Sequence, residues 1–192
     1  MIQSIIDQTM IGWEARVVGD GCPVIQEIID SGIYKEAQKA LIARGNCLII
    51  SNLDRNYGGC GYQIINKNLA EATGRYFIFG GNDDIFMPNH FDNYVTFMEE
   101  NPDLDFAFFN SRLDFIGGIR DAVLSPGGVG HSELIVKTNV AKSMPPHGKE
   151  YGHDWAFIDN LIRSGAKFRK ADFRPPTYRV MGVPGNREQG ID

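Results

Sequence analysis

Apolar residues recur along this chain in two alternating patterns. Short apolar or alternating runs predict strands at 14–18, 47–50, 76–79, 105–110, 133–137 and 167–173. Apolar residues at helical spacing predict helices over 2–8, 34–44 and 154–164, around Ile25–Ile29 and Ile65–Ala72, and from Pro88, as first helical residue, to the pair Asn101-Pro102. Because helices and strands alternate in the first half, the pattern predicts an α/β fold with a mixed, mainly parallel sheet flanked by helices.

Length and composition fit one globular domain. The chain has 192 residues, and its 11% aromatic content argues against disorder. A net charge of −5 disfavours nucleic acid as a main partner. No apolar run is long enough to span a bilayer, and no signal peptide opens the chain. The three cysteines lack metal-ligand spacing, so a reducing cytoplasm is the expected location.

The strand at 76–79 runs directly into Gly80-Gly81-Asn82-Asp83-Asp84. Two adjacent carboxylates repel each other unless a cation neutralises them, and glycine allows a sharp turn and close approach of a ligand. This segment is therefore a candidate site for a divalent metal that carries a phosphate, the alternative being an exposed acidic turn.

Polar groups also follow two other predicted strands. Asp20 comes after the strand at 14–18, and the glycine-rich loop 56–61 comes after the strand at 47–50. Ligands of such sheets bind beyond the carboxyl ends of the strands. Three strand ends that supply polar groups to one edge favour a ligand site there.

The order of these segments resembles the family 2 glycosyltransferases, which are inverting, nucleotide-sugar-dependent enzymes of the GT-A fold. The resemblance covers nearly all of the chain. It rests on these segments: Ser4–Thr9 with Trp13-Glu14, Val17–Gly21, Asn56–Gly74, Tyr76–Asp84 followed by Pro88, and Gly152–Trp155 followed by Arg163 and Gly165. The resemblance implies a nucleotide-sugar-binding half at 1–100, an acceptor and catalytic half at 101–173 and a Pro/Gly-rich tail at 174–192.

The resemblance also implies roles for individual residues. Asp83 matches the metal-binding Asp of the family's DxD motif, and Asp84 is a second candidate for Mn²⁺ or Mg²⁺, for a ligating water, or for capping the turn. Asp20 matches the carboxylate that accepts a hydrogen bond from uracil. Asp154 matches the general base that deprotonates the acceptor hydroxyl. The remaining candidates are Asn56, Gly58, Asn82 and Arg179 for the nucleotide, and His131 and Trp155 for the acceptor.

Several of these residues have simpler interpretations. Asp154 has the position of a helix N-cap, Arg179 that of a surface arginine, and Trp155 that of a core residue. The four histidines are scattered along the sequence, which disfavours metal binding by any one of them, although His147 and His153 flank Asp154.

The chain departs from the family at four points. Gly81 stands at the first Asp of the DxD motif, Ile65 at the usual Arg after the glycine loop, and Met181 at the His of the late Arg-x-His pattern. The family's first strand is also lacking, since Met1 falls inside the first helix. This leaves three options open: a segment of the working protein is missing, the sheet closes differently, or another chain covers the strand edges.

The first functional hypothesis is a small metal-assisted glycosyltransferase that moves a hexose from a UDP-sugar to the hydroxyl of a saccharide or other acceptor with inversion. The acceptor region is expected within 111–150, and a homo-oligomer stays open. The alternative is a non-catalytic GT-A-like module that binds nucleotide sugar or glycan, or serves assembly. A nucleotidyltransferase is a weaker third option, since its N-terminal glycine-rich nucleotide loop is not seen.

Overall fold

A computed structural model describes residues 1–82, 84–114 and 117–180. The helices are α1 (Ile2–Ile6), α2 (Pro23–Ser31), α3 (Lys35–Ala43), α4 (Tyr62–Glu71), α5 (His90–Glu100), α6 (Thr138–Ser143) and α7 (His153–Arg163), with short 3₁₀ turns η1 (Gly59–Gly61) and η2 (His131–Glu133). The strands are β1 (Glu14–Gly19), β2 (Cys47–Asn52), β3 (Tyr76–Ile78), β4 (Asp84–Phe86), β5 (Phe106–Phe109), β6 (Ser111–Leu113), β7 (Gly118–Arg120), β8 (Leu134–Lys137), β9 (Phe168–Ala171) and β10 (Tyr178–Val180).

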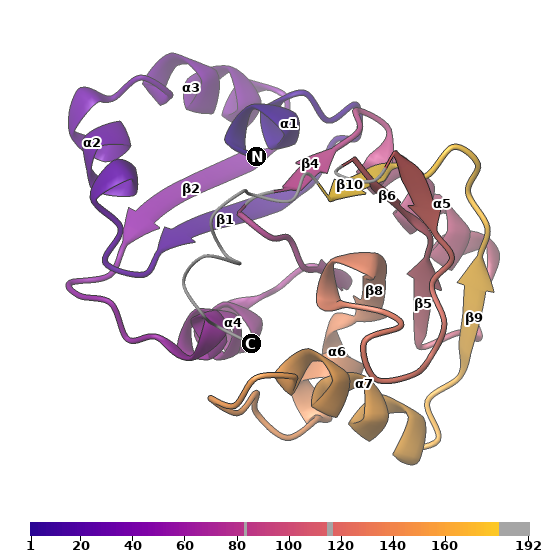
Figure 1. Cartoon of the computed structure of the whole chain (residues 1–192). Coiled ribbons are helices and arrows are strands. Elements are labelled where there is room, and N and C mark those ends of the chain that lie inside the picture. The colour runs from indigo at the N-terminus through magenta and orange to yellow at the C-terminus, as the bar shows by residue number, and fades with distance from the viewer. Residues whose placement is uncertain (83, 115–116, 181–192) are drawn as a thin grey trace.

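The strands form three sheets rather than one (Figure 1). β1 and β2 form a parallel pair, in register from Glu14 with Cys47 to Gly19 with Asn52. A second sheet has the order β3-β8-β5-β9, and a third has the order β4-β10-β6-β7. Among the described strands, the parallel pairs are β1–β2, β10–β6 and β5–β9, and the other four pairs are antiparallel. The sheet system is thus mixed, but less parallel than its sequence pattern predicts.

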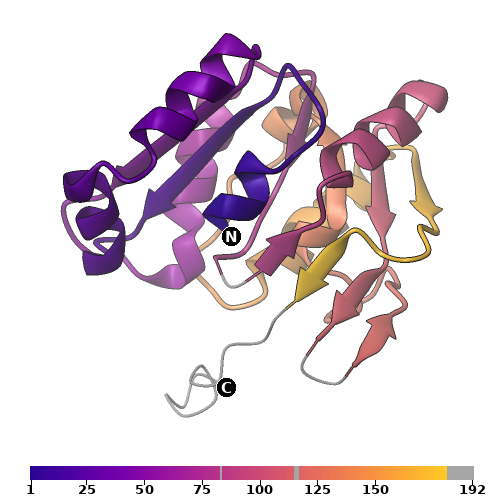
Figure 2. The same ribbon diagram turned by 90° about the horizontal axis from the view of Figure 1, so that it is seen from above.

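The helices cover the sheets from several sides. α2 and α3 pack on the β1–β2 pair, and Figure 2 shows this unit on one side of the molecule, with β6, β7, β9 and β10 on the other. α6 packs on β3 and β8 and also contacts α4. Apolar side chains from α4, α6 and α7 pack with β3, β5 and β8 into one core, and those from α1, α3, β1 and β2 pack with β4 and β10 into another.

β1 and β3 each present one edge to the space between the first two sheets. Trp13 and Gly19 turn their carbonyl groups to the β2 side, where they accept the N–H groups of Cys47 and Leu53. Alternate residues of a strand point their backbone groups to opposite sides, so those of Glu14, Arg16 and Val18 point away from β2. Within the described residues, β3 pairs only with β8, which leaves its other edge facing the same space.

Most predicted elements are present, with boundaries shifted by one to three residues. The shifts arise because backbone hydrogen bonds, and not the apolar pattern, decide where a helix or strand ends. Two predictions are corrected. Pro88 is not the first residue of a helix, because α5 begins at His90 and the Pro88 carbonyl instead accepts the Thr9 N–H at 2.9 Å. The tail from Arg174, whose Pro and Gly content predicts a loop, contains the strand β10, which pairs with β4 and β6. The short strands β4, β6 and β7 and the helix α6 were not predicted, because three to six residues carry too little periodicity.

Candidate functional site

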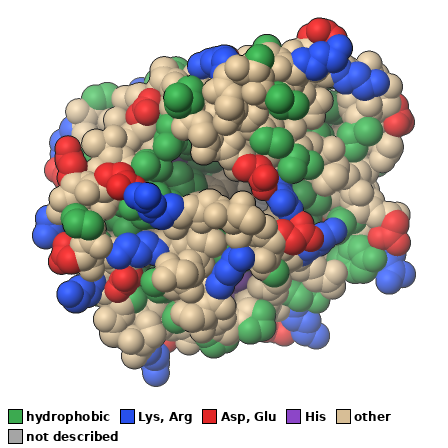
Figure 3. Space-filling model, turned by 180° about the vertical axis from the view of Figure 1, so that it is seen from behind, with side chains coloured by type: hydrophobic (Ala, Val, Ile, Leu, Met, Phe, Trp, Pro, Cys, Tyr) green, Lys and Arg blue, Asp and Glu red, His purple; other side chains and the backbone are tan. Residues whose placement is uncertain are grey.

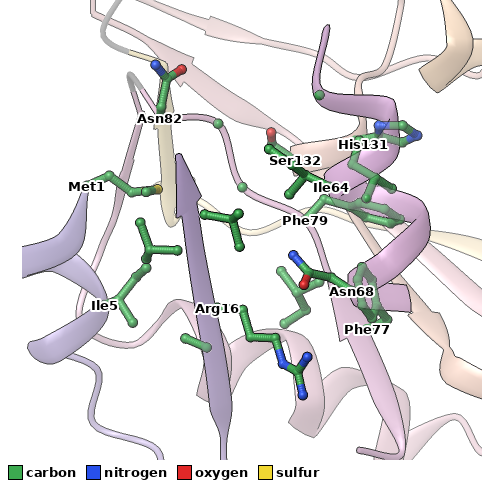
Figure 4. A pocket seen from close by; sticks show the side chains of 18 of the residues that line it. Met1, Ile5, Arg16, Ile64, Asn68, Phe77, Phe79, Asn82, His131 and Ser132 are labelled. Atoms are coloured by element: carbon green, nitrogen blue, oxygen red, sulfur yellow. The ribbon is translucent and has the colours of Figure 1, made fainter. Parts of the chain in front are cut away.

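A large open cleft separates the β1–β2 unit from the sheet that contains β3. Its volume is about 2010 Å³. It is lined by β1, by parts of α1, α2, α4 and α5, by the segment from β3 to Asn82, and by the segments 130–132 at η2 and 151–155 at the start of α7. Figure 4 looks into it and shows Met1 and Ile5 on one side of β1, and Ile64, Asn68 and Phe79 on the other. Seen from behind in Figure 3, the molecule is hollowed near its centre, with charged side chains beside the hollow.

Asp20 lies directly after β1, at the carboxyl end of the strand, and lines the cleft. Its carboxylate accepts the backbone N–H groups of Tyr57 at 2.9 Å and Gly58 at 3.0 Å. The Asn56 side-chain oxygen accepts the same Gly58 N–H at 2.7 Å. A carboxylate offers about four acceptor positions, so two backbone contacts leave Asp20 able to accept a further N–H donor from a ligand.

The loop that carries Asp20 and the glycine-rich loop interlock. Gly21 has a φ of +61°, and a Cβ there would lie 2.4 Å from the Arg55 backbone. The Asn52 side chain bridges both loops: its oxygen accepts the Cys22 N–H at 2.9 Å, and its amide donates to the Cys22 carbonyl at 3.0 Å. These contacts fix Asp20 and the backbone of residues 55–58 relative to each other before any ligand arrives.

Asp154 lies in the first turn of α7, on the opposite wall of the cleft. It is half-buried, and its carboxylate accepts the Trp155 N–H at 2.7 Å. Its second oxygen lies 3.8 Å from where a Cβ on Gly130 would stand, so the loop before η2 approaches it closely. Trp155 lines the cleft and also packs against the apolar core.

The acidic turn is only partly described. Gly80 is needed for packing, because a Cβ there would lie 2.6 Å from the ring of Phe86. The Gly81 N–H donates to the Tyr178 hydroxyl at 3.2 Å, and Asn82 is exposed and lines the cleft. Gly80 thus makes an aromatic contact, and because Gly80 and Gly81 both line the cleft, the close approach of a ligand there stays a prediction. Asp83 lies outside the described residues.

Asp84 is the first residue of β4 and is buried. Its carboxylate accepts a hydrogen bond from the hydroxyl group of Tyr178, which lies on the neighbouring strand β10. Asp84 does not line the cleft. Burial, followed by the Asp84 charge, raises the pKa of Tyr178, so this hydroxyl remains a donor at any ordinary pH. The sequence could not show this, because the partner of Asp84 is 94 residues away.

The Arg179 side chain is directed at Asp114 and not into the cleft. Its guanidinium forms an ion pair with Asp114, just after β6, and this pairing is the main reason why the pKa of Asp114 is lowered. Arg179 does not line the cleft, nor do Asn56 and Gly58. The Gly58 backbone N–H donates to Asp20, and the Asn56 side chain accepts from the same N–H. The cleft therefore collects Asp20, Asn82, His131, Asp154 and Trp155 of the predicted site residues, and not Asn56, Gly58, Asp84 or Arg179.

His131 lies in η2 and forms a cluster with His147 and His153, which we call the histidine cluster. One ligand nitrogen of each ring lies within 4.8 Å of those of the others. Burial, together with the neighbouring imidazoles, holds the pKa of His131 well below its usual range, and burial lowers the pKa of His147 to about 4. Both rings are therefore neutral at pH 7. The sequence gives no sign of this cluster, because spacings of 16 and 6 residues between the three histidines match no metal motif.

Two further expectations concern the cysteines and membrane spans. Cys22, Cys47 and Cys60 are free thiols in the described structure. Among the helices that the structure describes, none combines the length and the apolar character that crossing a bilayer requires.

Comparisons with known proteins identify the fold. No protein-family model matches the sequence, and no curated protein matches it. S. aureus TarS superposes with a TM-score of 0.72 at 18% identity, covering 98% of this chain and 35% of that one. TarS 1–349 in complex with UDP-GlcNAc gives a TM-score of 0.72 at 17% identity, covering 100% of this chain and 56% of that one. HddC from Yersinia pseudotuberculosis gives 0.52 at 13% identity, covering 98% and 80%.

These likenesses confirm the predicted fold class. The chain is one small α/β domain of the GT-A fold, which it shares with TarS. It spans between about a third and three fifths of the length of the TarS structures that it matches, namely 35%, 56% and 57% for three of them.

Proposed function

We propose that this chain is a glycosyltransferase module that uses a UDP-sugar donor. The observation that carries the proposal is the arrangement of carboxylates in the cleft: Asp20 stands at the carboxyl end of β1, and Asp154 stands across from it in the first turn of α7. The fold supports it, because TarS has the same architecture and has been solved with UDP-GlcNAc and with UDP.

In this proposal the nucleotide lies in the part of the cleft at the carboxyl end of β1, beside Asp20. Asp20 accepts the ring N–H of uracil on its remaining acceptor positions, while the interlocked loop 55–58 holds the carboxylate in place. The carboxyl ends of parallel strands are where such folds bind their ligands. The sugar then extends along the cleft toward Asn82 and the loop at 130–132.

Asp154 acts as the general base. The acceptor hydroxyl oxygen forms a bond to the anomeric carbon while the bond between that carbon and the diphosphate oxygen breaks. The hydroxyl proton passes to the Asp154 carboxylate, and the bonding electron pair leaves with UDP. Attack from the face opposite the leaving group inverts the anomeric configuration. Trp155 and His131 lie beside Asp154 in the cleft, where an acceptor would bind.

The divalent ion expected from the sequence, Mn²⁺ or Mg²⁺, would stabilise charge on the leaving diphosphate. The described residues fit it only weakly: Asn82 offers one amide oxygen to the cleft, whereas the Asp84 carboxylate is buried against Tyr178. Metal assistance therefore depends on Asp83, and we assign no step of the transfer to Asp84.

The proposal predicts the behaviour of Asp154→Asn. This change removes the proton acceptor but keeps the side-chain shape, so UDP binding should be unchanged and transfer should fall by about 10²- to 10⁴-fold, the usual contribution of a general base. UDP binding is measured by isothermal titration calorimetry with and without Mn²⁺, and transfer by UDP release in a screen of nucleotide sugars. Asp20→Asn is the matched variant and should weaken UDP binding instead. Transfer that survives in Asp154→Asn would show that another group is the base.

A binding module without turnover is the second candidate. It is favoured by the acidic turn, where Gly81 replaces a carboxylate and Asp84 is engaged by Tyr178. It predicts that the chain binds UDP or a nucleotide sugar but releases no UDP with any donor and acceptor. UDP release that depends on Asp83 would exclude it.

A further inference from the structure

Three histidines from separate parts of the chain meet at one wall of the cleft. His131 comes from η2, His147 from the loop between α6 and α7, and His153 is the first residue of α7. The Nε2 atoms of His131 and His147 face each other at 3.0 Å, and one nitrogen of each of the three rings lies within 4.8 Å of the others. His131 and His153 line the cleft, and His147 lies buried behind them.

Asn66 of α4 holds His147 in one orientation. The Asn66 amide donates to the His147 carbonyl at 2.9 Å, and its oxygen accepts the His147 backbone N–H at 2.8 Å. With its oxygen so placed, Asn66 can only accept from the ring Nδ1, which lies 3.2 Å away. The proton of His147 is therefore on Nδ1, and its Nε2 lone pair is directed at His131. A fixed partner on the second ring nitrogen is how proteins orient histidines that bind metals.

His153 supplies a ring nitrogen without a partner. Its Nδ1 atom is buried, with no hydrogen-bond partner among the described residues. A buried polar atom without a partner has an energetic cost that an additional ligand would remove. The cluster thus combines an unpartnered ring nitrogen on His153 with a lone pair of His147 whose direction is fixed.

The spacing suits a tetrahedral ion with nitrogen ligands. Zn–N bonds are about 2.0–2.1 Å long, so two nitrogens on a tetrahedral zinc lie about 3.3 Å apart. The 3.0 Å separation between His131 and His147 is close to this value. Nitrogens within 4.8 Å of one another need to close by at most about 1.5 Å to bind the same ion, so binding requires a rotation of the His153 side chain.

The surroundings favour a borderline transition metal over Mg²⁺ or Mn²⁺. The donor set is three imidazoles, whereas hard cations prefer oxygen ligands. Phe79 stacks on His131 with a centroid distance of 4.5 Å, and Phe157 stacks on His147 at 4.7 Å. These apolar rings limit water on the inner side and leave the cleft as the open direction.

We propose that the histidine cluster binds one zinc-type transition metal ion, with His131, His147 and His153 as ligands and an open position toward the cleft. The ion joins η2, the loop before α7 and the start of α7, which are the segments around Asp154 and Gly130. Its effect is to fix this wall of the cleft. The proposal is independent of UDP, of Asp83 and of the proposed transfer reaction.

The test uses the full chain without a histidine tag, stripped with a chelator, and Zn²⁺ as the only ligand. We expect one Zn²⁺ per chain by calorimetry and a rise in melting temperature. Co²⁺ in place of Zn²⁺ should give the visible absorption bands of a tetrahedral site.

Zn²⁺ binding should be abolished in each of the variants His131→Gln, His147→Gln and His153→Gln. Asn66→Ala should weaken Zn²⁺ binding by about 10- to 100-fold, as expected when the partner of a ligand is removed. Cys60→Ser removes an exposed thiol outside the cluster and should leave the Zn²⁺ affinity unchanged.

Folding of each variant is checked by circular dichroism. Equal Zn²⁺ binding by the wild type and all three histidine variants would overturn the proposal, since the ion would then bind elsewhere. No Zn²⁺ binding by the folded wild type would also overturn it and would leave the cluster as aromatic packing. Because no nucleotide is present, neither result bears on the glycosyltransferase proposal.

Discussion

At the scale of single residues, the structure divides the polar groups of the predicted site into two kinds. Asp20 and Asp154 reach the cleft and keep acceptor capacity for a ligand. Asp84 and Arg179 are engaged by Tyr178 and Asp114, and they hold short strands together. All four are charged residues within or next to a strand or helix, so only their partners in space distinguish the two roles.

Asp84→Asn should therefore act on stability. The variant replaces a buried charged acceptor by a neutral one, which should lower the free energy of unfolding by about 1–3 kcal/mol. Urea unfolding of the wild type, Asp84→Asn, Tyr178→Phe and the double variant forms a cycle that measures the coupling. Asp83→Asn serves as the functional counterpart and should reduce Mn²⁺-dependent UDP binding. If Asp84→Asn leaves stability unchanged and removes Mn²⁺ dependence, Asp84 is a metal ligand after all.

Gly80→Ala tests the packing role of the first glycine in the acidic turn. The added Cβ would lie 2.6 Å from the Phe86 ring, which is itself buried. Overpacking of this kind should cost about 1–3 kcal/mol of unfolding free energy, measured by urea denaturation. Gly148→Ala is the matched control, because nothing lies within 4 Å of its Cβ position. Equal stability of both variants would mean that Gly80 has room that the structure does not show.

At the scale of elements, the division of the sheets creates the cleft. β1 pairs with β2 and β3 pairs with β8, while no pairing joins β1 to β3 among the described residues. The sequence left open how the edges of these strands are covered. The structure shows the unpaired edges, and the cleft lies between them.

Amide exchange along β1 should alternate. The amides of Ala15 and Val17 face β2 and should exchange slowly, whereas those of Glu14, Arg16 and Val18 face the cleft and should exchange faster. Residue-resolved hydrogen–deuterium exchange by NMR measures this directly. Uniform protection along β1 would show that its cleft-facing edge is paired in solution.

At the scale of the whole molecule, buried neutral histidines link stability to pH. Burial lowers the pKa of His90, which lies fully buried with its Nδ1 atom 3.1 Å from the Thr177 hydroxyl, to about 3. A histidine whose pKa is lower in the folded than in the unfolded chain binds more protons when unfolded. The contribution of His90 to the free energy of unfolding is therefore fully present above pH 6.5. It is lost progressively as the pH falls from 6.5 toward 3.

For His90 alone the expected loss between pH 7 and pH 5 is about 2 kcal/mol, following roughly 1.4 kcal/mol per pH unit below the unfolded pKa. Urea unfolding at these two pH values, with a chelator present, gives the difference. His90→Gln cannot be protonated and should show a smaller pH dependence, although its stability at pH 7 will be lower. If both proteins lose the same stability, His90 is not the source.

The sequence was sufficient for the longer elements and for naming Asp20 and Asp154, the two carboxylates that reach the cleft, as candidates. Periodicity located the longer helices and strands, and the rule that ligands bind beyond strand ends pointed to Asp20, because both signals depend on neighbours within a few residues. Asp154 was found through a resemblance in the order of segments. Pairing between distant residues was decided only by the tertiary structure. It divided the sheet, turned Asp84 toward Tyr178 and Arg179 toward Asp114, and brought His131, His147 and His153 together. Such contacts depend on how the chain closes over long separations, and a linear pattern carries no record of that.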